Sequence, residues 1–182
     1  CWFISAAIAV SSVPEHLNRV IPKNQSFEID YAGIFHFRFY HFGEWVDVCV
    51  DDRLPVDSNN RLIYCNNMKD KNEMFGPLLE KAYAKLNKCY EFLNGGCSID
   101  GLIDLTGGVN ERIRIEELLS DDDIFTSEEF IKRNDRKDYL WDLISNSLGM
   151  KSLVSCVIKK TTDKNQLLLK NNQLAIDHSY SI

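Results

Sequence analysis

The segment IFHFRFYHFGEWVDVCV, residues 34–50, restricts the fold of this chain more than any other segment does. Aromatic and β-branched side chains occupy alternate positions along two runs, and Gly43 and Glu44 lie between the runs. Alternation of this kind places one set of side chains on a single face of a sheet, and a glycine between two such runs is typical of a hairpin. The segment therefore predicts two antiparallel strands.

Helical spacing occurs in other parts of the chain. The first ten residues, CWFISAAIAV, carry no charge and are too short to span a bilayer, so they predict a buried helix. Residues 72–93 place apolar side chains on one side of a helix and charged ones, including Glu80, on the other, and Gly95 and Gly96 end it. Further helices are expected within residues 98–109 and 120–150, and strands within residues 151–160 and 174–182.

This mixture of helices and strands predicts an α+β fold with two unequal lobes. The 182 residues suffice for one ordinary domain or two small lobes, and contents of 45% hydrophobic and 26% charged residues are typical of globular proteins. Consecutive glycines give the backbone the freedom that a hinge needs. We therefore place the lobe boundary after Gly96, so that residues 1–96 form the first lobe and residues 97–182 the second.

Charge and cysteine content exclude one class of partner and indicate a compartment. The net charge of −6, without any basic run, argues against a nucleic-acid partner, because such binding relies on Lys and Arg contacts to phosphates. The six cysteines form no CxxC pair, and Cys49 and Cys156 lie in apolar stretches where a reduced cysteine packs as a small hydrophobe. We expect reduced thiols and a cytoplasmic, intracellular location.

Cys1 is the first candidate for chemistry. A thiol has a pKa of about 8.5 in water, and the thiolate is the nucleophilic form. The unpaired N–H groups and the macrodipole at a helix N-terminus favour an anion, and the predicted first helix places the Cys1 sulfur at such an end. The alternative is a buried cysteine that only packs against the helix.

A cysteine nucleophile also needs a general acid and base, and imidazole titrates near neutral pH. The chain contains four histidines. His36 and His41 flank the aromatic strand on its polar side and His16 lies in a polar segment, so these three are better explained as structural or solvated residues. His178 begins a β-like segment in the other lobe and is the remaining candidate.

Five long motifs extend these observations to nearly the whole chain. In order they are CWFISAAIAV, YAGIFHFRFYHFGEWVDVCVDDRLPV, NEMFGPLLEKAYAKLNKCYEFLNGG, DLTGGVNE and HSYSI. In this order and at these separations they resemble the protease core of the calpains, the calcium-dependent, papain-like intracellular cysteine proteases. The resemblance implies a papain-like core in which a helical lobe carries the nucleophile and a mostly β lobe carries the histidine.

The resemblance implies catalytic roles for two residues. Cys1 matches the family's nucleophile at the N-terminus of the central helix, and His178 matches the general base and acid. The family's third catalytic group, an asparagine, would follow beyond Ile182, and the glutamine of the oxyanion hole would precede Cys1. We therefore expect a protease core that is incomplete at both ends.

Three further positions follow from the resemblance. Glu73 matches a carboxylate in a regulatory calcium site, where oxygen ligands suit the hard cation; alternatively it is an acid that faces a helix dipole. Gly95 and Gly96 match glycines that border the substrate cleft, where an extended peptide can approach a backbone without side chains. Alternatively, the two glycines are an ordinary helix stop and hinge.

Asp177 departs from the family pattern, because calpains usually have glycine immediately before the catalytic histidine. A carboxylate beside the imidazole would favour the imidazolium, yet its bulk and charge would also obstruct a substrate backbone. We therefore count Asp177 among the substrate-binding candidates. The alternative is that Asp177 points to solvent and changes little.

Three hypotheses for the function follow. The first is a calcium-dependent cysteine endopeptidase that performs limited proteolysis of protein substrates, with regulatory domains or a regulatory subunit outside this chain. The second, which Asp177 favours, is a calpain-like binding or scaffolding protein with impaired catalysis. The third is an N-terminal-nucleophile hydrolase that uses the α-amino group of Cys1 as its base; it ranks last because such folds surround the nucleophile with strands.

Overall fold

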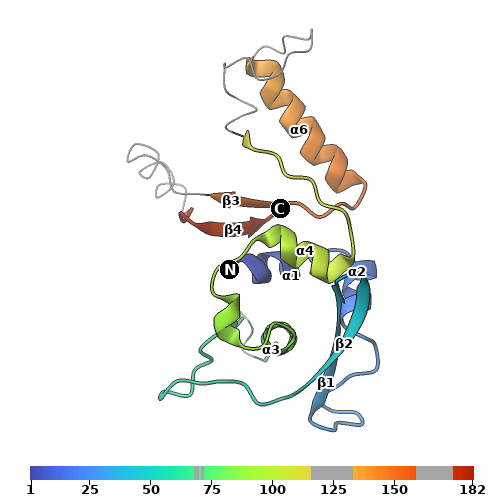
Figure 1. Cartoon of the computed structure of the whole chain (residues 1–182), viewed down its shortest axis with the longest axis vertical. Coiled ribbons are helices and arrows are strands. Elements are labelled where there is room, and N and C mark those ends of the chain that lie inside the picture. The colour runs from blue at the N-terminus through green and yellow to red at the C-terminus, as the bar shows by residue number, and fades with distance from the viewer. Residues whose placement is uncertain (68–69, 71, 116–132, 159–173) are drawn as a thin grey trace.

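The computed structural model describes residues 1–67, 70, 72–115, 133–158 and 174–182. The chain combines helices with short antiparallel strands, which confirms the predicted α+β class (Figure 1). The elements are α1 (Trp2–Ser11), α2 (Pro14–Val20), β1 (Ile34–His41), β2 (Glu44–Asp51), α3 (Phe75–Leu86), the 3₁₀ helix η1 (Tyr90–Leu93), α4 (Ser98–Thr106), α6 (Arg133–Gly149), β3 (Ser155–Ile158) and β4 (His178–Ser181).

The predicted hairpin is confirmed as the antiparallel pair β1 and β2. His41 pairs with Glu44, so the turn consists of Phe42 and Gly43, whose φ angles of 49° and 91° are those of a type I′ turn. Phe35, Phe37 and Phe39 are fully buried on one face, as alternation requires. The opposite face carries His36 and its cross-strand partner Cys49.

Cys49 corrects one expectation, because it is exposed and not packed as a small hydrophobe. Cys49 pairs with the half-buried His36, which places it on the outer face of the hairpin. Its apolar neighbours Val48 and Val50 point to the inner face. All six cysteines are free thiols, as predicted from their spacing.

Helix α1 lies at the centre of the fold and confirms the predicted buried helix. It packs against α4, α2 and α3, and also against β4 on the other side, so Figure 1 shows it between β4 and α3. Its buried side chains include Trp2, Phe3, Ala6 and Val10. These join the inner face of the hairpin and the apolar side of α3 in one hydrophobic core.

The predicted helix at residues 72–93 is wrong at its C-terminal end. Helix α3 stops at Leu86, and Lys88 adopts a left-handed φ of 85° before η1 begins. The pair Gly95 and Gly96 therefore follows the 3₁₀ helix and does not terminate α3. The next predicted helix is confirmed as α4, which Gly107 closes with a left-handed φ of 69°.

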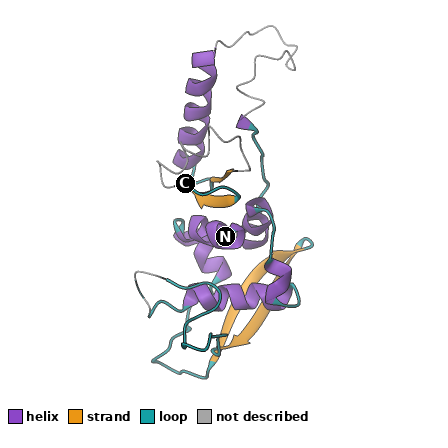
Figure 2. Cartoon of the chain, turned by 90° about the vertical axis from the view of Figure 1, so that its left-hand side faces the viewer, coloured by secondary structure: helices purple, strands orange, loops and turns teal. Residues whose placement is uncertain are grey.

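The second half of the described chain contains α6 and a second sheet. The strands expected within residues 151–160 and 174–182 are present as β3 and β4, which pair antiparallel, while α6 extends away from the core (Figures 1 and 2). The boundary after Gly96 stays a prediction; α4, which follows it, contributes Leu105 to the core around α1. None of the helices in the described ranges combines the length and apolar character that crossing a bilayer requires.

Candidate active site

Cys1 is the N-cap of α1 and is exposed. The N–H of Ser5 donates to the Cys1 carbonyl at 2.8 Å, which closes the first turn of the helix. The apolar face of α1 anchors this turn in the core, so the helix N-terminus directs its partial positive charge toward the position of the thiol. The exposure of Cys1 argues against the alternative of a buried, purely packing cysteine, and the catalytic role of Cys1 stays a prediction.

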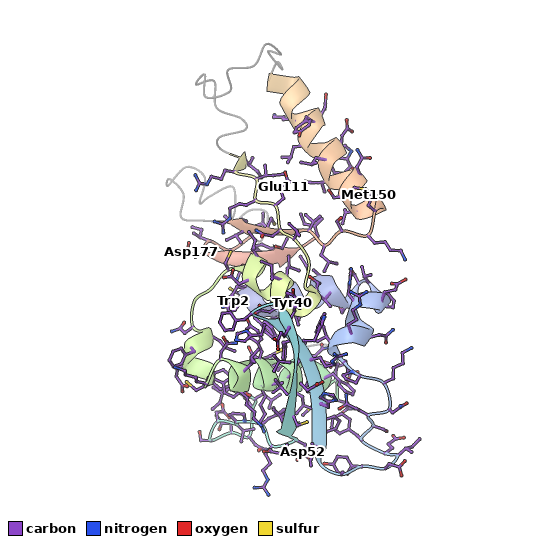
Figure 3. The ribbon with its side chains drawn as sticks, turned by 45° about the vertical axis from the view of Figure 1, so that its right-hand side comes forward. Trp2, Tyr40, Asp52, Glu111, Met150 and Asp177 are labelled. Atoms are coloured by element: carbon purple, nitrogen blue, oxygen red, sulfur yellow. The ribbon has the colours of Figure 1, made fainter. Side chains whose placement is uncertain are left out.

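Trp2 links the nucleophile position to the two glycines of the predicted substrate cleft. Its indole N–H donates to the Leu93 carbonyl at 3.0 Å, and its ring is buried (Figure 3). A Cβ atom at Gly96 would lie 2.3 Å from the indole ring, so only glycine fits there. Glycine is favoured at position 95 for another reason: the backbone there has a left-handed φ of 86°, which residues with a side chain rarely adopt. The role of both glycines in substrate binding stays a prediction.

His178 is the first residue of β4 and is half-buried. Its ring packs edge-on against Tyr180 with centroids 5.1 Å apart, and the Tyr180 hydroxyl accepts a hydrogen bond from the Ala175 N–H at 2.7 Å. Between them, Ser179 is buried on the opposite face of the strand. Because β4 packs against α1, the fold brings together the strand that begins at His178 and the helix that begins at Cys1.

The other three histidines lie on elements other than β4. His36 Nε2 lies 2.6 Å from Asp47 Oδ1 on the outer face of the hairpin. His41 contacts the exposed ring of Phe42 at the hairpin turn, and His16 lies on α2. His178, by contrast, begins β4, which packs directly against α1.

The backbone at Asp177 explains why glycine is usual at this position. Asp177 has a left-handed φ of 53°, and its N–H donates to the Ile158 carbonyl at 2.7 Å to begin the β3–β4 pairing. Glycine adopts this conformation without strain, and aspartate tolerates it better than most other residues. The side chain of Asp177 is exposed, which agrees with the alternative that it points to solvent (Figure 3).

Two replacements of Asp177 should show whether the protein needs the left-handed backbone at this position or the carboxylate itself. Asp177→Gly should change the rate of substrate cleavage by less than about threefold, because glycine keeps the left-handed backbone. Asp177→Val should destabilise the protein by about 1–2 kcal/mol, because a β-branched residue is strained at positive φ. Urea unfolding and kcat/KM on the full-length protein measure both effects; an inactive glycine variant would show that the carboxylate itself is needed.

Glu73 caps helix α3. Its Oε1 accepts a hydrogen bond from the Gly76 N–H at 2.9 Å, which lies in the first turn, before the first helical bond from the Leu78 N–H to the carbonyl of the N-cap Met74. This confirms the alternative in which the acid faces the helix dipole. Within the described ranges no group of three or more His, Cys, Asp or Glu side chains could hold a metal ion. Glu73 therefore suits calcium as one oxygen ligand but does not form a complete site with the residues around it.

A small pocket beside α3 holds a second thiol. Glu80, expected on the solvent side of the helix, is instead half-buried there and accepts the Cys65 N–H at 2.7 Å. Burial, followed by the charges of Glu80 and Glu73, raises the pKa of the Cys65 thiol to about 11. Burial likewise raises the pKa of Cys156. Both thiols are therefore protonated and poorly nucleophilic near neutral pH.

One buried polar contact near the site has no signal in the sequence. The hydroxyl of Tyr83 on α3 donates to Asp104 Oδ2 on α4 at 2.7 Å. Tyr83 was expected on the apolar side of its helix and lies there, 2% exposed, but Asp104 follows no recognisable pattern in the segment SIDGLIDLT. Pairing an aspartate with a tyrosine on another helix depends on tertiary packing, which local spacing does not encode.

Comparisons with known proteins show the family to which the chain is similar. Residues 1–182 match the family model described as calpain family cysteine protease. Similar proteins include calpain-5 of Mus musculus, 42% identical over 188 residues, the calpain-2 catalytic subunit of Gallus gallus, 37% identical over 182, and calpain-8 of Homo sapiens, 36% identical over 182. Each match covers 100% of this chain but only 28%, 23% and 23% of the respective relative. The chain thus spans about a quarter of the length of these relatives.

Proposed function

The chain belongs to the calpain family of cysteine proteases, and from this we propose that it forms the catalytic part of a calcium-dependent cysteine endopeptidase. The substrates would be intracellular proteins that the enzyme cuts at a limited number of sites. The observation that carries the proposal is the packing of α1, which begins at Cys1, against β4, which begins at His178. Reduced cysteines agree with the cytoplasmic location that we propose.

The proposed reaction uses the two residues in turn. The Cys1 thiolate attacks the carbonyl carbon of the scissile peptide bond, and protonated His178 gives its proton to the departing amine, which leaves a thioester on Cys1. His178 then removes a proton from water, the resulting hydroxide attacks the thioester, and the carboxylic acid product departs as the Cys1 thiolate and protonated His178 are restored. The N-terminus of α1 stabilises the thiolate at the start of this sequence.

Calcium would act as a regulatory ion, with Glu73 as one of its ligands. The Glu73 carboxylate is a hard oxygen donor, and Oε2 is free of the capping bond that Oε1 makes to Gly76. The remaining ligands would come from other parts of the protein. When bound, the ion would favour the alignment of the two lobes and so the approach of His178 to Cys1.

The calcium requirement is tested by cleavage of a peptide substrate by the full-length protein, with calcium or with excess chelator. We expect cleavage only with calcium. Glu73→Gln keeps a capping acceptor for Gly76 but removes the charge, so it should raise the calcium concentration needed for half-maximal activity by about tenfold. Glu28→Gln, which changes an exposed carboxylate, is the matched control. Equal cleavage in chelator would contradict the calcium dependence but not the protease.

The second candidate function is a calpain-like binding or scaffolding protein with impaired catalysis. Asp177 beside His178 is the residue that favours it. Its exposed side chain and its left-handed backbone weigh against an obstructed site, and we rank this function second. Other domains or a regulatory subunit are the partners that we propose for either function.

A further inference from the structure

Tyr83 and Asp104 form a partly buried pair that packs against the first turn of α1, the helix that follows Cys1. The Tyr83 hydroxyl donates to Asp104 Oδ2 at 2.7 Å and so joins α3 to α4. Burial, with the hydrogen bond to Asp104 as the next cause, raises the pKa of Tyr83 far above its usual value. The hydroxyl therefore remains a donor throughout the physiological pH range.

The first turn of α1 packs against the ring of Tyr83. Phe3 stacks on it with ring centroids 4.0 Å apart and planes within 8° of parallel. Trp2 meets the same ring edge-on at 5.9 Å. Both residues that directly follow Cys1 thus contact one side chain, and the bond to Asp104 fixes the position of that side chain.

Trp2 carries this contact on to the predicted substrate cleft. Its indole ring fills the space beside Gly96, and its N–H bonds to Leu93, so the segment that ends in the two glycines is built against it. A continuous path of contacts therefore runs from Asp104 through Tyr83 and Trp2 to Gly96. The first turn of α1 and the glycine segment are held relative to each other by the same set of buried groups.

Burial of the Asp104 carboxylate lowers the stability of the fold, so a purely structural role does not explain why an aspartate occupies this position. It is half-buried, its carboxylate makes no salt bridge with any residue in the described ranges, and burial raises its pKa. Burying a carboxylate without a salt-bridge partner costs stability, and the Tyr83 hydroxyl and the charge of His41 offset only part of that cost. A hydrogen bond to a carboxylate is also stronger and better oriented than one between neutral groups. Orientation of the Tyr83 ring is what such a bond supplies.

We propose that Tyr83 and Asp104 are positioning residues, which hold the first turn of α1 so that Cys1 stays in register with the glycine segment of the substrate cleft. The inference rests on the proposed function, because it assigns Cys1 as the nucleophile. Misplacing a reacting group by about 1 Å can cost about 100-fold in rate, so a small tilt of the Tyr83 ring is enough to matter.

Tyr83→Phe tests the pair in the full-length protein, because it keeps the stacked ring and removes only the hydroxyl. We expect kcat to fall by about tenfold with KM changed by less than about threefold, since the variant affects the nucleophile more than substrate affinity. Asp104→Asn keeps an acceptor and should retain kcat within about threefold of wild type. Asp104→Leu removes the acceptor and should match Tyr83→Phe, and the double variant should be no slower than either.

The control is Tyr31→Phe, which deletes a Tyr–Asp hydrogen bond of the same kind, to Asp52, on the exposed surface. It should leave kcat unchanged. Urea unfolding of each variant establishes that it is fully folded in the assay. Wild-type kcat in Tyr83→Phe, additive losses in the double variant, or an equal loss in Tyr31→Phe would each overturn the proposal.

Alkylation of Cys1 by iodoacetamide, followed by peptide mass spectrometry, reports on the nucleophile without any cleavage. Tyr83→Phe should slow this reaction by about fivefold, because a displaced first turn stabilises the thiolate less. If the wild-type protein cleaves no peptide and yet this slowing is seen, the proposed function fails and the positioning role stands. If cleavage is normal and both readouts are unchanged in Tyr83→Phe, the positioning role fails alone.

Discussion

Replacing Cys1 by alanine is expected to lower kcat for peptide cleavage by about 10⁴-fold or more, to the limit of detection. The reason is that the variant removes the nucleophile that forms the thioester, while the buried face of α1 that positions it stays intact. His178→Ala should have a comparable effect, because the leaving amine then departs without a proton. The double variant should be no slower than the slower single one, since both residues serve the same step.

The matched control for this experiment is Cys65→Ala. Cys65 is half-buried beside Glu80, and its thiol pKa is raised to about 11. Its thiol is therefore protonated near neutral pH, and we expect it to have no catalytic role. Rates are measured with the full-length protein and calcium, and circular dichroism establishes that each variant is folded. Residual activity above 1% in Cys1→Ala, or inactivation by Cys65→Ala in a folded protein, would show that the nucleophile has been assigned to the wrong thiol.

Gly96→Ala is expected to destabilise the protein by about 3 kcal/mol. The new Cβ would lie 2.3 Å from an indole carbon of Trp2, well inside van der Waals contact. Either the ring moves, which disturbs the turn that carries Cys1, or the glycine segment moves away from the cleft. Cleavage should therefore also fall, and urea unfolding together with kcat/KM measures both effects.

Gly149→Ala provides the control, because nothing lies within 4 Å of a Cβ at that position, and its effect should stay within about 0.5 kcal/mol. A smaller ring should relieve the clash, so Gly96→Ala combined with Trp2→Phe should cost less than the sum of the two single variants. A Gly96→Ala protein as stable as wild type would mean that Trp2 does not occupy the space beside this glycine.

Local patterns were enough to predict the hairpin and the central helix. The alternation in residues 34–50 and the uncharged run at residues 2–11 each depend on neighbours within a few positions, which is the range over which side-chain periodicity is informative. The end of α3 was missed for the opposite reason. Helical spacing of apolar residues continues into η1, while the Asn87 side chain bonds back to the Tyr83 carbonyl and Lys88 turns left-handed.

The site was predictable only in part. The resemblance identified Cys1 and His178, but their elements meet through packing between segments at opposite ends of the chain, which no local spacing encodes. The reason for glycine at position 96 was equally hidden, because its partner Trp2 lies near the start of the chain, far from Gly96 in the sequence. Asp177 is the opposite case. Its place immediately before His178 suggested from the sequence that catalysis could be impaired, whereas the left-handed φ of its backbone explains the position without any catalytic role.

The central claim, that Cys1 is a thiolate nucleophile served by His178, is tested most directly by titrating the full-length protein with a thiol-directed peptide inhibitor in calcium. Mass spectrometry then locates the adduct among the six cysteines. We expect one equivalent of label on Cys1, which should form much more slowly in His178→Ala. Label spread over several cysteines, or a Cys1 that reacts no faster than the exposed Cys49, would contradict it.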